Sequence, residues 1–204
     1  MTIPVTVFSD YICPFCYIGS LRLISLSDEF DLDITWAGIE IHPETPAEGM
    51  PVEDLGYDPA QWQAMMGALE RMAGEEGVTL GTRAFTTNSR RALLLAEAAK
   101  DAGPAVFACL HERLFRAYLC EGRNIGDAEV LWALASECGL DDRRVEAAWL
   151  GTDIPQRLQQ YQQAAARVGI TGTPTFLINN DRALVGAVET DELRQALDQC
   201  LAPR

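Results

Sequence analysis

Two cysteines near the amino terminus, Cys13 and Cys16, are the residues of this chain whose type and spacing most clearly suggest chemistry. They enclose Pro14 and Phe15 in the stretch FSDYICPFCYIGS. Such a pair can be half of a zinc site, a redox-active dithiol, or two inert thiols of a hydrophobic core. The rest of the chain has to decide among the three.

The distribution of possible metal ligands disfavours zinc. A zinc site needs a second close pair of Cys or His ligands. The other cysteines are isolated in sequence, and the two histidines, His42 and His111, lie far apart. We therefore predict no metal ligand. Two inert core thiols also fit poorly beside a proline and a helix start. The favoured interpretation is a redox-active disulfide, with no bound cofactor.

The position of Cys13 favours a reactive thiolate. The segment IPVTVFSD, residues 3–10, is typical of a strand, and Pro14 suits the first turn of a helix. At a helix N-terminus, unpaired amide N–H groups and the helix dipole stabilise negative charge. We expect the pKa of Cys13 to lie below the value of about 8.5 for free cysteine. Cys13 is the predicted nucleophile, and Cys16, further into the helix, is the predicted resolving thiol.

The two residues between the cysteines should tune the couple. Pro14 opens the helix, and Phe15 stands where a histidine would add a polar or positive contribution. Strong oxidants owe their potential to an unusually stabilised thiolate. Since Phe15 adds no such contribution, we expect a milder couple than that of the strongest oxidants.

The elements that must position these residues follow the order βαβ, helices, ββα. LDITWAGIEI, residues 32–41, is the predicted second strand, and a strand–helix–strand unit of this kind implies a parallel crossover. The segments 173–179 and 182–187 predict a β-hairpin. Thr190 then begins a last helix. Between Glu44 and Gly169 the patterns are helical throughout.

Neither β-region can bury a sheet alone, so we predict a single sheet. The predicted fold class is α/β, a thioredoxin fold (βαβ…ββα) with a large all-helical insertion. Residues 1–43 and 169–204 are expected to form the thioredoxin-like domain. Residues 44–168 are expected to form the insertion domain, which should overhang the dithiol.

Composition limits the partners and the compartment. The chain has 204 residues, 48% of them hydrophobic, and a net charge of −14. That charge argues against nucleic acid and anionic membranes as partners. No apolar run approaches the roughly 18 residues of a membrane span, and no secretory signal is visible. We expect a soluble cytoplasmic protein, monomer or homodimer, in which the remaining cysteines are unpaired helix residues rather than disulfide partners: Cys109, Cys120, Cys138 and Cys200.

A second candidate segment, GITGTPTF, places Thr173 and Pro174 at the entry to a strand. Proline is tolerated at the first residue of a strand, and a cis X–Pro bond is a specific feature of tight turns. In the thioredoxin plan this loop carries a cis proline that faces the dithiol. The backbone N–H and C=O before it are then free to pair with an extended substrate. We predict a cis Thr173–Pro174 bond.

SDYICPFCYIGS and GITGTPTFLIN resemble the two active-site segments of the DsbA-like thioredoxin family. IEIHPETPAEG and the stretch from LHERLF to SECGLD are similar to the FrnE-like branch, predicted dithiol–disulfide isomerases linked to polyketide biosynthesis. The resemblance spans nearly the whole chain. It implies a protein disulfide oxidoreductase or isomerase acting on protein or low-molecular-weight thiols and disulfides, with Cys13 and Cys16 as the redox pair and Pro174 as the cis proline. Phe15, where Trp is common, and Leu93, where His is common, depart from the branch.

The same superfamily contains glutathione-dependent enzymes, the kappa-class transferases and 2-hydroxychromene-2-carboxylate isomerases, which this plan also resembles. They usually carry Ser at the position of Cys13. A glutathione-dependent small-molecule isomerase or transferase is therefore the alternative function, and glutathione is a candidate co-substrate. A binding module without catalysis is a third reading.

Further residues have candidate roles at the site. Glu40, on the second predicted strand, could accept a proton from Cys16, or it could simply hydrogen-bond at the strand end. Tyr11 and Tyr17 flank the motif and are expected to line the substrate groove.

The remaining candidates lie in or near the predicted insertion. His42 is expected to be structural. Arg90 and Arg91 are expected on a solvated helix face, with a role in holding glutathione carboxylates as the alternative. A stripe at helical spacing is expected to be core, with an adaptable substrate surface as the alternative: Trp62, Met65, Met66, Leu69 and Met72.

Overall fold

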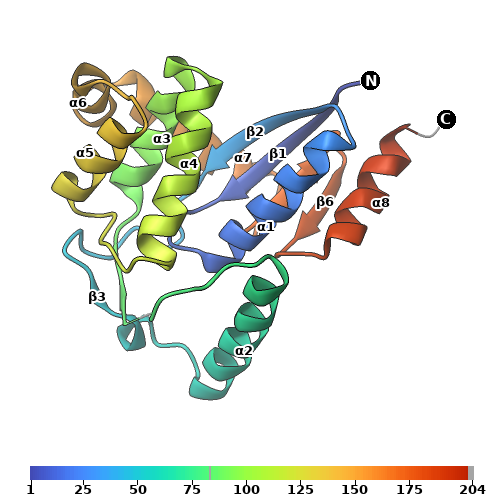
Figure 1. The fold of residues 1–204 in the computed structure, drawn as a ribbon, viewed down its shortest axis with the longest axis horizontal. Coiled ribbons are helices and arrows are strands. Elements are labelled where there is room, and N and C mark those ends of the chain that lie inside the picture. Colours follow the sequence, from blue (N-terminus) through green and yellow to red (C-terminus); the bar gives the residue numbers. More distant parts are fainter. Residues whose placement is uncertain (83, 202–204) are drawn as a thin grey trace.

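The computed structural model describes residues 1–82 and 84–201. Residues 83 and 202–204, which the predicted domain limits include, lie outside the described residues. At the centre is a four-stranded mixed sheet with the order β2–β1–β5–β6 (Figure 1). A sheet that joins strands from both ends of the chain agrees with the thioredoxin plan.

The strands lie close to the predicted segments. β1 (Ile3–Ser9) runs parallel to β2 (Leu32–Gly38), and helix α1 (Pro14–Ser25) connects them. β5 (Thr175–Ile178) is antiparallel to β1 and forms a hairpin with β6 (Arg182–Val185). The predicted crossover and hairpin are both confirmed. β2 ends three residues earlier than predicted, because only the segment to Gly38 pairs with β1.

Different helices cover the two faces of the sheet. On one face, Val5 and Val7 pack with α1 and with helix α8 (Thr190–Leu201). On the other face, Phe8 packs with helix α7 (Asp153–Arg167). Side chains alternate between the faces of a strand, so the near-continuous hydrophobic run of β1 follows from burial on both sides.

The remaining helices form the large middle block. In Figure 1, the helices labelled α3, α4, α5 and α6 gather beyond one end of the sheet, while α2 stands apart from them. No helix among residues 1–82 and 84–201 is long and apolar enough to cross a membrane. Two short 3-10 turns, η1 and η2, complete the chain. The bounds are α2 (Pro59–Glu75), α3 (Arg90–Ala102), α4 (Pro104–Leu119), α5 (Ala128–Glu137), α6 (Asp142–Leu150), η1 (Leu26–Asp28) and η2 (Val52–Leu55).

The expectation that the middle block is entirely helical is wrong in one place. β3 (Met50–Pro51) and β4 (Phe85–Thr86) pair antiparallel as a small second sheet on either side of α2. Two residues per strand are too few to show an alternating pattern, so the sequence carries no strand signal there.

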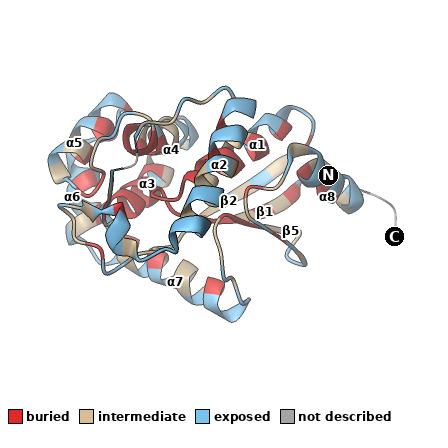
Figure 2. Cartoon of the chain, turned by 90° about the horizontal axis from the view of Figure 1, so that it is seen from below, coloured by how far each residue is buried: buried red, intermediate tan, exposed pale blue. Residues whose placement is uncertain are grey.

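The dithiol shares one hydrophobic core with the middle block. Cys13 and Cys16 belong to the same cluster of buried residues as α3, whose Leu95 and Ala99 are fully buried. Figure 2 shows α3 mostly buried and α2 mostly exposed. The segment that carries the two cysteines and the helices of the middle block are therefore packed as one unit, with α2 mostly exposed beside them.

One disulfide contradicts the expectation that the remaining cysteines are unpaired. Cys109 of α4 and Cys138, the C-cap of α5, are joined by a disulfide bond, whereas Cys120 and Cys200 form no disulfide. The two partners are 29 residues apart in sequence and form no motif. They meet because α4 and α5 pack against each other, which the helical pattern alone does not reveal.

Candidate functional site

The dithiol sits where the sequence places it, at the start of α1. Cys13 is the N-cap, with extended backbone angles, and Pro14 is the first helical residue. Proline fixes φ for the first turn and needs no N–H partner there. Cys13 is 6% exposed and Cys16 is 1% exposed, and both are free thiols. Of the two buried thiols, the slightly more exposed one is thus Cys13, at the helix N-terminus.

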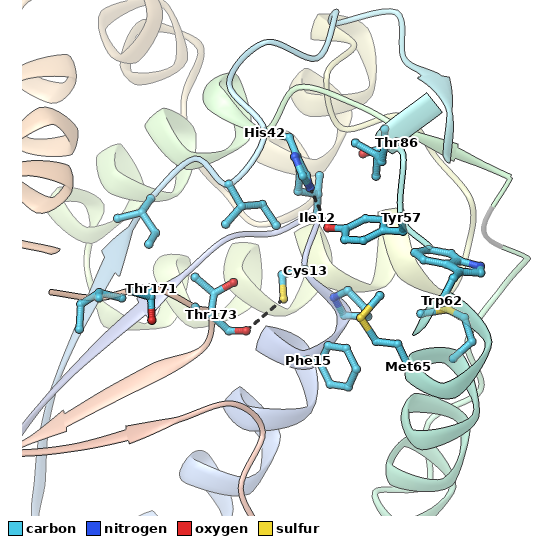
Figure 3. A pocket seen from close by; sticks show the side chains of 17 residues that line it. Ile12, Cys13, Phe15, His42, Tyr57, Trp62, Met65, Thr86, Thr171 and Thr173 are labelled. Atoms are coloured by element: carbon cyan, nitrogen blue, oxygen red, sulfur yellow. Dashed lines mark hydrogen bonds between the residues drawn. The ribbon is translucent and has the colours of Figure 1, made fainter. Parts of the chain in front are cut away.

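The loop before β5 faces the dithiol. The Thr173–Pro174 peptide bond is cis, the geometry anticipated from the sequence. The Cys13 Sγ donates to the Thr173 carbonyl oxygen at 3.6 Å, as Figure 3 shows. A Cβ on Gly19 of α1 would lie 3.0 Å from Pro174 Cγ and 2.8 Å from a ring carbon of Phe176. Glycine there lets the helix and the loop approach closely.

The two thiols have opposite pKa shifts. The hydrogen bond from Cys16 lowers the pKa of Cys13, with smaller contributions from Thr173 and the Cys16 backbone N–H, while burial opposes the shift. Burial raises the pKa of Cys16, and the neighbouring Cys13 raises it further. Hydrogen bonds to a thiolate favour the ionised form and burial disfavours it. Cys13 is therefore the thiol that ionises first.

Asp10 is a site residue that the sequence analysis missed. It is fully buried, and its carboxylate accepts hydrogen bonds from Ser89 Oγ at 2.9 Å, from the Ile41 N–H at 2.9 Å and from the Ile12 N–H at 3.3 Å. Burial raises its pKa from 3.8 to about 6, and its charge in turn opposes ionisation of Cys13. The sequence does contain a signal for Asp10. It is a carboxylate directly after an apolar strand, three residues before Cys13.

Glu40 is engaged away from the dithiol. Its carboxylate pairs with Arg90 at 2.8 Å and accepts a hydrogen bond from Gln162 at 3.4 Å. These contacts join the end of β2 to α3 and α7. They favour the simpler of the two roles considered, a hydrogen-bonding and ion-pairing residue at the strand end.

Tyr11 and Tyr17 are not among the residues that line the cavity over Cys13, which corrects the expectation that both line the substrate groove. Tyr11 is buried, and its hydroxyl makes a 2.8 Å hydrogen bond with His111 Nδ1. Tyr17 is buried, donates to Glu112 Oε1 at 2.8 Å and stacks on Phe115. Helix α4 supplies both a hydrophobic surface and a polar partner for each hydroxyl, so the rings turn into the core.

His111 joins the helical block to the active-site segment. Its two ring nitrogens make hydrogen bonds with Tyr11 at 2.8 Å and with Ser20 of α1 at 3.0 Å. Burial lowers its pKa to about 3, so the imidazole is neutral in the folded protein. Both partners lie more than ninety residues away in sequence, and no local pattern identifies this role.

An open cavity of about 450 Å³ lies over Cys13. Figure 3 shows the Cys13 sulfur, the Thr173 carbonyl and the rings of Tyr57 and Trp62 around it. Aliphatic and aromatic side chains make up most of the wall. The lining residues are Ile12, Cys13, Pro14, Phe15, Ile39, Ile41, His42, Leu55, Tyr57, Trp62, Met65, Met66, Thr86, Ile170, Thr171, Gly172 and Thr173.

The α2 stripe divides between core and cavity. Leu69 is buried, as expected of a core residue, and Met72 packs against the same buried cluster. Trp62, Met65 and Met66 line the cavity instead, which agrees with the alternative reading of the stripe. The insertion therefore overhangs the dithiol, as predicted.

The other predicted candidates lie at or beyond the rim. His42 lines the cavity, and its ring is within 3.4 Å of the Tyr57 hydroxyl and 3.7 Å of Glu44. Arg90 is paired with Glu40, and Arg91 lies over the Trp149 ring. Within the described part of the chain, no cluster of three or more His, Cys, Asp or Glu residues could hold a metal ion.

Comparison with known proteins gives a consistent family. The family model for the DSBA-like thioredoxin domain matches residues 4–198. The uncharacterized protein YwbO of Bacillus subtilis (strain 168) is 30% identical over 204 residues, 97% of this chain and 96% of that protein.

Solved structures agree with the family match. The probable DsbA oxidoreductase SCO1869 from Streptomyces coelicolor superposes with a TM-score of 0.86 at 26% identity, covering 99% of this chain and 91% of that one. The cytosolic disulfide reductase DsbM from Pseudomonas aeruginosa, solved with GSH, superposes with a TM-score of 0.69 at 23% identity, covering 97% and 98%. The latter likeness concerns the fold.

Proposed function

The chain belongs to the family of DSBA-like thioredoxin domains, and on that premise we propose that it is a thiol–disulfide oxidoreductase or isomerase that works by dithiol–disulfide exchange at Cys13 and Cys16. One observation carries the proposal. The thiol with the lowered pKa is the N-cap of α1, and the cis-proline loop faces it at 3.6 Å. A thiolate held beside a loop that can pair with a substrate chain is the arrangement that disulfide exchange needs.

The proposed reduction proceeds in two displacements. The Cys13 thiolate attacks one sulfur of the substrate disulfide, and the other substrate sulfur leaves as a thiolate that takes up a proton. Cys16 then loses its proton and attacks the Cys13 sulfur, which releases the second substrate thiol. The substrate gains two electrons, and the enzyme ends as the Cys13–Cys16 disulfide. Run in reverse, the same steps oxidise a substrate dithiol.

Isomerisation uses the same first step. If a second thiol of the substrate attacks the mixed disulfide before Cys16 does, the substrate leaves with a rearranged disulfide and the enzyme remains a dithiol. The burial-raised pKa of Cys16 keeps that thiol largely protonated at neutral pH, which lengthens the life of the mixed disulfide. Proteins and low-molecular-weight disulfides are the proposed substrates.

Insulin reduction with dithiothreitol tests the proposal. We expect the wild-type protein to accelerate the precipitation of insulin chains and Cys13→Ser to abolish the acceleration. Cys200→Ser, which alters a cysteine of α8 that forms no disulfide and lies outside the described lining of the cavity, is the matched control and should retain the wild-type rate. Full activity of Cys13→Ser would refute the proposal.

A glutathione-dependent small-molecule enzyme is the second candidate. It is favoured by one neighbour having been solved with GSH and by the resemblance to the glutathione-dependent isomerases and transferases. In that case Cys16 would not be needed. Turnover of a small aromatic substrate with glutathione by Cys16→Ser at the wild-type rate would support this candidate over dithiol exchange.

We also propose that the protein acts in the cytoplasm, as the name of the DsbM neighbour says of that protein. Thiol systems in the cytosol usually keep protein cysteines reduced, so the state of the Cys109–Cys138 disulfide bears on this proposal. Thiol alkylation in intact cells, followed by lysis and fractionation, measures both the location of the protein and the state of that bond.

A further inference from the structure

The wall of the active-site cavity opposite the cis-proline loop is aromatic. Tyr57 and Trp62 stack with ring centroids 5.7 Å apart and an angle of 28° between the ring planes. Both line the cavity together with Phe15 and Met65. Tyr57 is 44% exposed, so the free protein leaves a large apolar surface open beside its reactive sulfur. Figure 3 shows these rings on the insertion side of the Cys13 thiol.

The polar groups of the cavity are almost all uncharged. Thr86, Thr171 and Thr173 contribute hydroxyl groups. Among the described residues that line it, none is Arg, Lys, Asp or Glu. His42 is the one titratable nitrogen base of this lining, and Glu44 lies 3.7 Å from its ring. The described residues of the lining therefore offer no Arg or Lys side chain with which to bind a carboxylate.

This chemistry discriminates between two kinds of disulfide. Glutathione carries two carboxylates and one ammonium group at neutral pH, and a carboxylate that leaves water needs a charged or multiply hydrogen-bonded partner. The chain adds a net charge of −14, which repels anions at longer range. Of the two arginines considered from the sequence, Arg90 is already paired with Glu40. Anionic disulfides are thus disfavoured at this wall.

An extended polypeptide fits the same features. The Thr173 carbonyl lies 3.6 Å from Cys13 Sγ, so a chain that pairs with this loop carries its cysteine to the thiolate. The side chain next to that cysteine then enters a cavity of about 450 Å³, which is in the range of sites for small organic groups. Stacked aromatic rings favour contact with another aromatic ring beyond the contribution of its burial.

Resting on the proposed function, we propose that the substrates of this site are disulfides of extended, uncharged or cationic polypeptide segments with an aromatic residue beside the cysteine, and that glutathione disulfide is a poor substrate. The Tyr57–Trp62 stack determines this preference. In the reaction, the Cys13 thiolate displaces one peptide thiolate, Cys16 displaces the other, and two electrons pass from the dithiol to the peptide disulfide.

The test compares single-turnover rates for matched disulfides. Two short disulfide-linked peptides differ only in having Phe or Ser beside the cysteine, and glutathione disulfide is the third substrate. Reduced protein is mixed with an excess of each, quenched with acid and analysed by mass spectrometry for the Cys13–Cys16 disulfide. We expect the Phe peptide to react about 2- to 10-fold faster than the Ser peptide, and glutathione disulfide to be the slowest of the three.

Variants assign the preference to the aromatic wall. Trp62→Ala and Tyr57→Ala should each bring the Phe-to-Ser rate ratio toward one. Leu150→Ala, which shortens an 85% exposed side chain at the end of α6 outside the cavity lining, should leave the ratio as in the wild type. Met65→Lys supplies the missing cation and should raise the rate with glutathione disulfide, in a manner that added salt suppresses.

The outcomes separate this inference from the function on which it rests. Equal rates with all three disulfides, each dependent on Cys13, would overturn the aromatic preference and leave disulfide exchange standing. A faster reaction with glutathione disulfide than with either peptide would also overturn it. No Cys13-dependent reaction with any disulfide would overturn both.

Discussion

At the scale of single residues, the reactivity of the site depends on opposing effects on one sulfur. Cys16 and Thr173 lower the pKa of Cys13, while burial and the carboxylate of Asp10 raise it. The helix N-terminus adds its partial positive charge on the side of the thiolate. Asp10 is the one negative charge among these groups, so it moderates the nucleophile rather than activating it.

We predict that Asp10→Asn lowers the pKa of Cys13. Because the pKa of Asp10 is about 6, its carboxylate is largely ionised at neutral pH and opposes the thiolate. The amide keeps the shape and removes the charge. Iodoacetamide alkylation of Cys13 against pH should have its midpoint at lower pH in the variant than in the wild type. An unchanged or higher midpoint would show that the carboxylate does not act on Cys13.

Glu40→Gln is the matched control. Glu40 is also a carboxylate near the end of β2, but it is paired with Arg90. Its charge is a small influence that raises the pKa of Asp10, and it is not among the main influences on the pKa of Cys13. Its alkylation midpoint should stay close to that of the wild type.

The sequence revealed the residues that act through local geometry and hid those that act across the fold. Cys13 and Pro14 indicate a helix start, and Thr173–Pro174 indicates a turn, because these features depend on adjacent residues. Asp10 meets Ser89 across 79 positions. A contact of that kind is created by packing, so the structure was needed to identify Asp10 as a buried carboxylate that acts on Cys13.

At the scale of elements, a buried arginine connects helix α1 to the helix that overhangs the site. Arg22 is 1% exposed and pairs with Glu75 and Glu76 at 2.8 Å and with Glu189 at 3.2 Å. It also donates to the carbonyls before α8. These bonds hold the C-terminal end of α2 against α1, while the opposite end of α2 carries Trp62 and Met65 to the cavity.

We predict that Arg22→Met destabilises the protein by about 2–4 kcal/mol. Removing one partner of a buried ion pair typically costs about 3–5 kcal/mol, and the partial exposure of the glutamates reduces that figure. Urea unfolding measures it. Arg71→Met is the matched control, since Arg71 is an exposed residue of α2 that pairs with Glu75. Exposed pairs contribute about 0–1 kcal/mol. Equal losses in the two variants would contradict the account of Arg22.

We predict that His111 makes stability depend on pH. Its folded-state pKa of about 3 lies below the value of 6.5 for a free histidine. The unfolded chain therefore takes up a proton that the folded chain does not, and stability is lost as the pH falls from about 6.5 toward 3, by at most about 1.4 kcal/mol per pH unit. In urea unfolding, the stability gap between wild type and His111→Gln should narrow between pH 7 and pH 4.5.

Tyr11→Phe separates this titration from the loss of a hydrogen bond. The variant removes the bond to His111 Nδ1 but keeps the imidazole buried and titratable. Its stability gap to the wild type should stay nearly constant over the same pH range. If the His111→Gln gap is also constant, the neutral buried imidazole is not the cause of the pH dependence.

Elements with a clear period were predictable, and elements held by distant pairing were not. The segment from Ile3 to Ser9 reads as a strand because it is β-branched and buried, and the helices of the middle block have recognisable caps and apolar faces. The β3–β4 pair was not predicted because a two-residue strand is too short to show an alternating pattern of side chains. Tyr11 and Tyr17 were misplaced because position beside a motif does not fix the side to which a ring turns.

At the scale of the whole molecule, the helical block acts as part of the active site rather than as an attachment. The dithiol and α3 share one buried cluster, and α2 supplies one wall of the cavity. We propose residues 44–168 as an insertion into a thioredoxin-like domain formed by 1–43 and 169–204. The molecule carries its charge of −14 outside the described lining of the cavity, so substrate selection there depends on apolar contact.

We predict that Cys138→Ser destabilises the oxidised protein by about 3–4 kcal/mol, the loop-closure value for a bond that spans 29 residues. Urea unfolding with and without reductant measures it, and Cys200→Ser is the control because Cys200 forms no disulfide. Identical stability of the wild type and Cys138→Ser under oxidising conditions would show that the Cys109–Cys138 bond does not stabilise the fold.

The fold class could be predicted from the order of elements. A βαβ unit and a ββα unit that cannot each bury a sheet are expected to combine their strands in one sheet, as they do here. The residues that line the cavity could not be predicted in this way. Tyr57 and His42 come from connecting segments whose course the sequence leaves open, and Trp62 belongs to a stripe that reads equally well as core. The packing of α2 against α1, to which Arg22 contributes, turns one side of that stripe toward the cavity.

The most direct test of the central claim is to trap the mixed disulfide. Cys16→Ser removes the resolving thiol, so after incubation with a peptide disulfide and acid quench, mass spectrometry of the digested protein should find the peptide linked to Cys13. Cys13→Ser should carry no such adduct at Cys16. An adduct that forms on Cys120 or Cys200 in place of Cys13, or no adduct in Cys16→Ser, would contradict the assignment of Cys13 as nucleophile and Cys16 as resolving thiol.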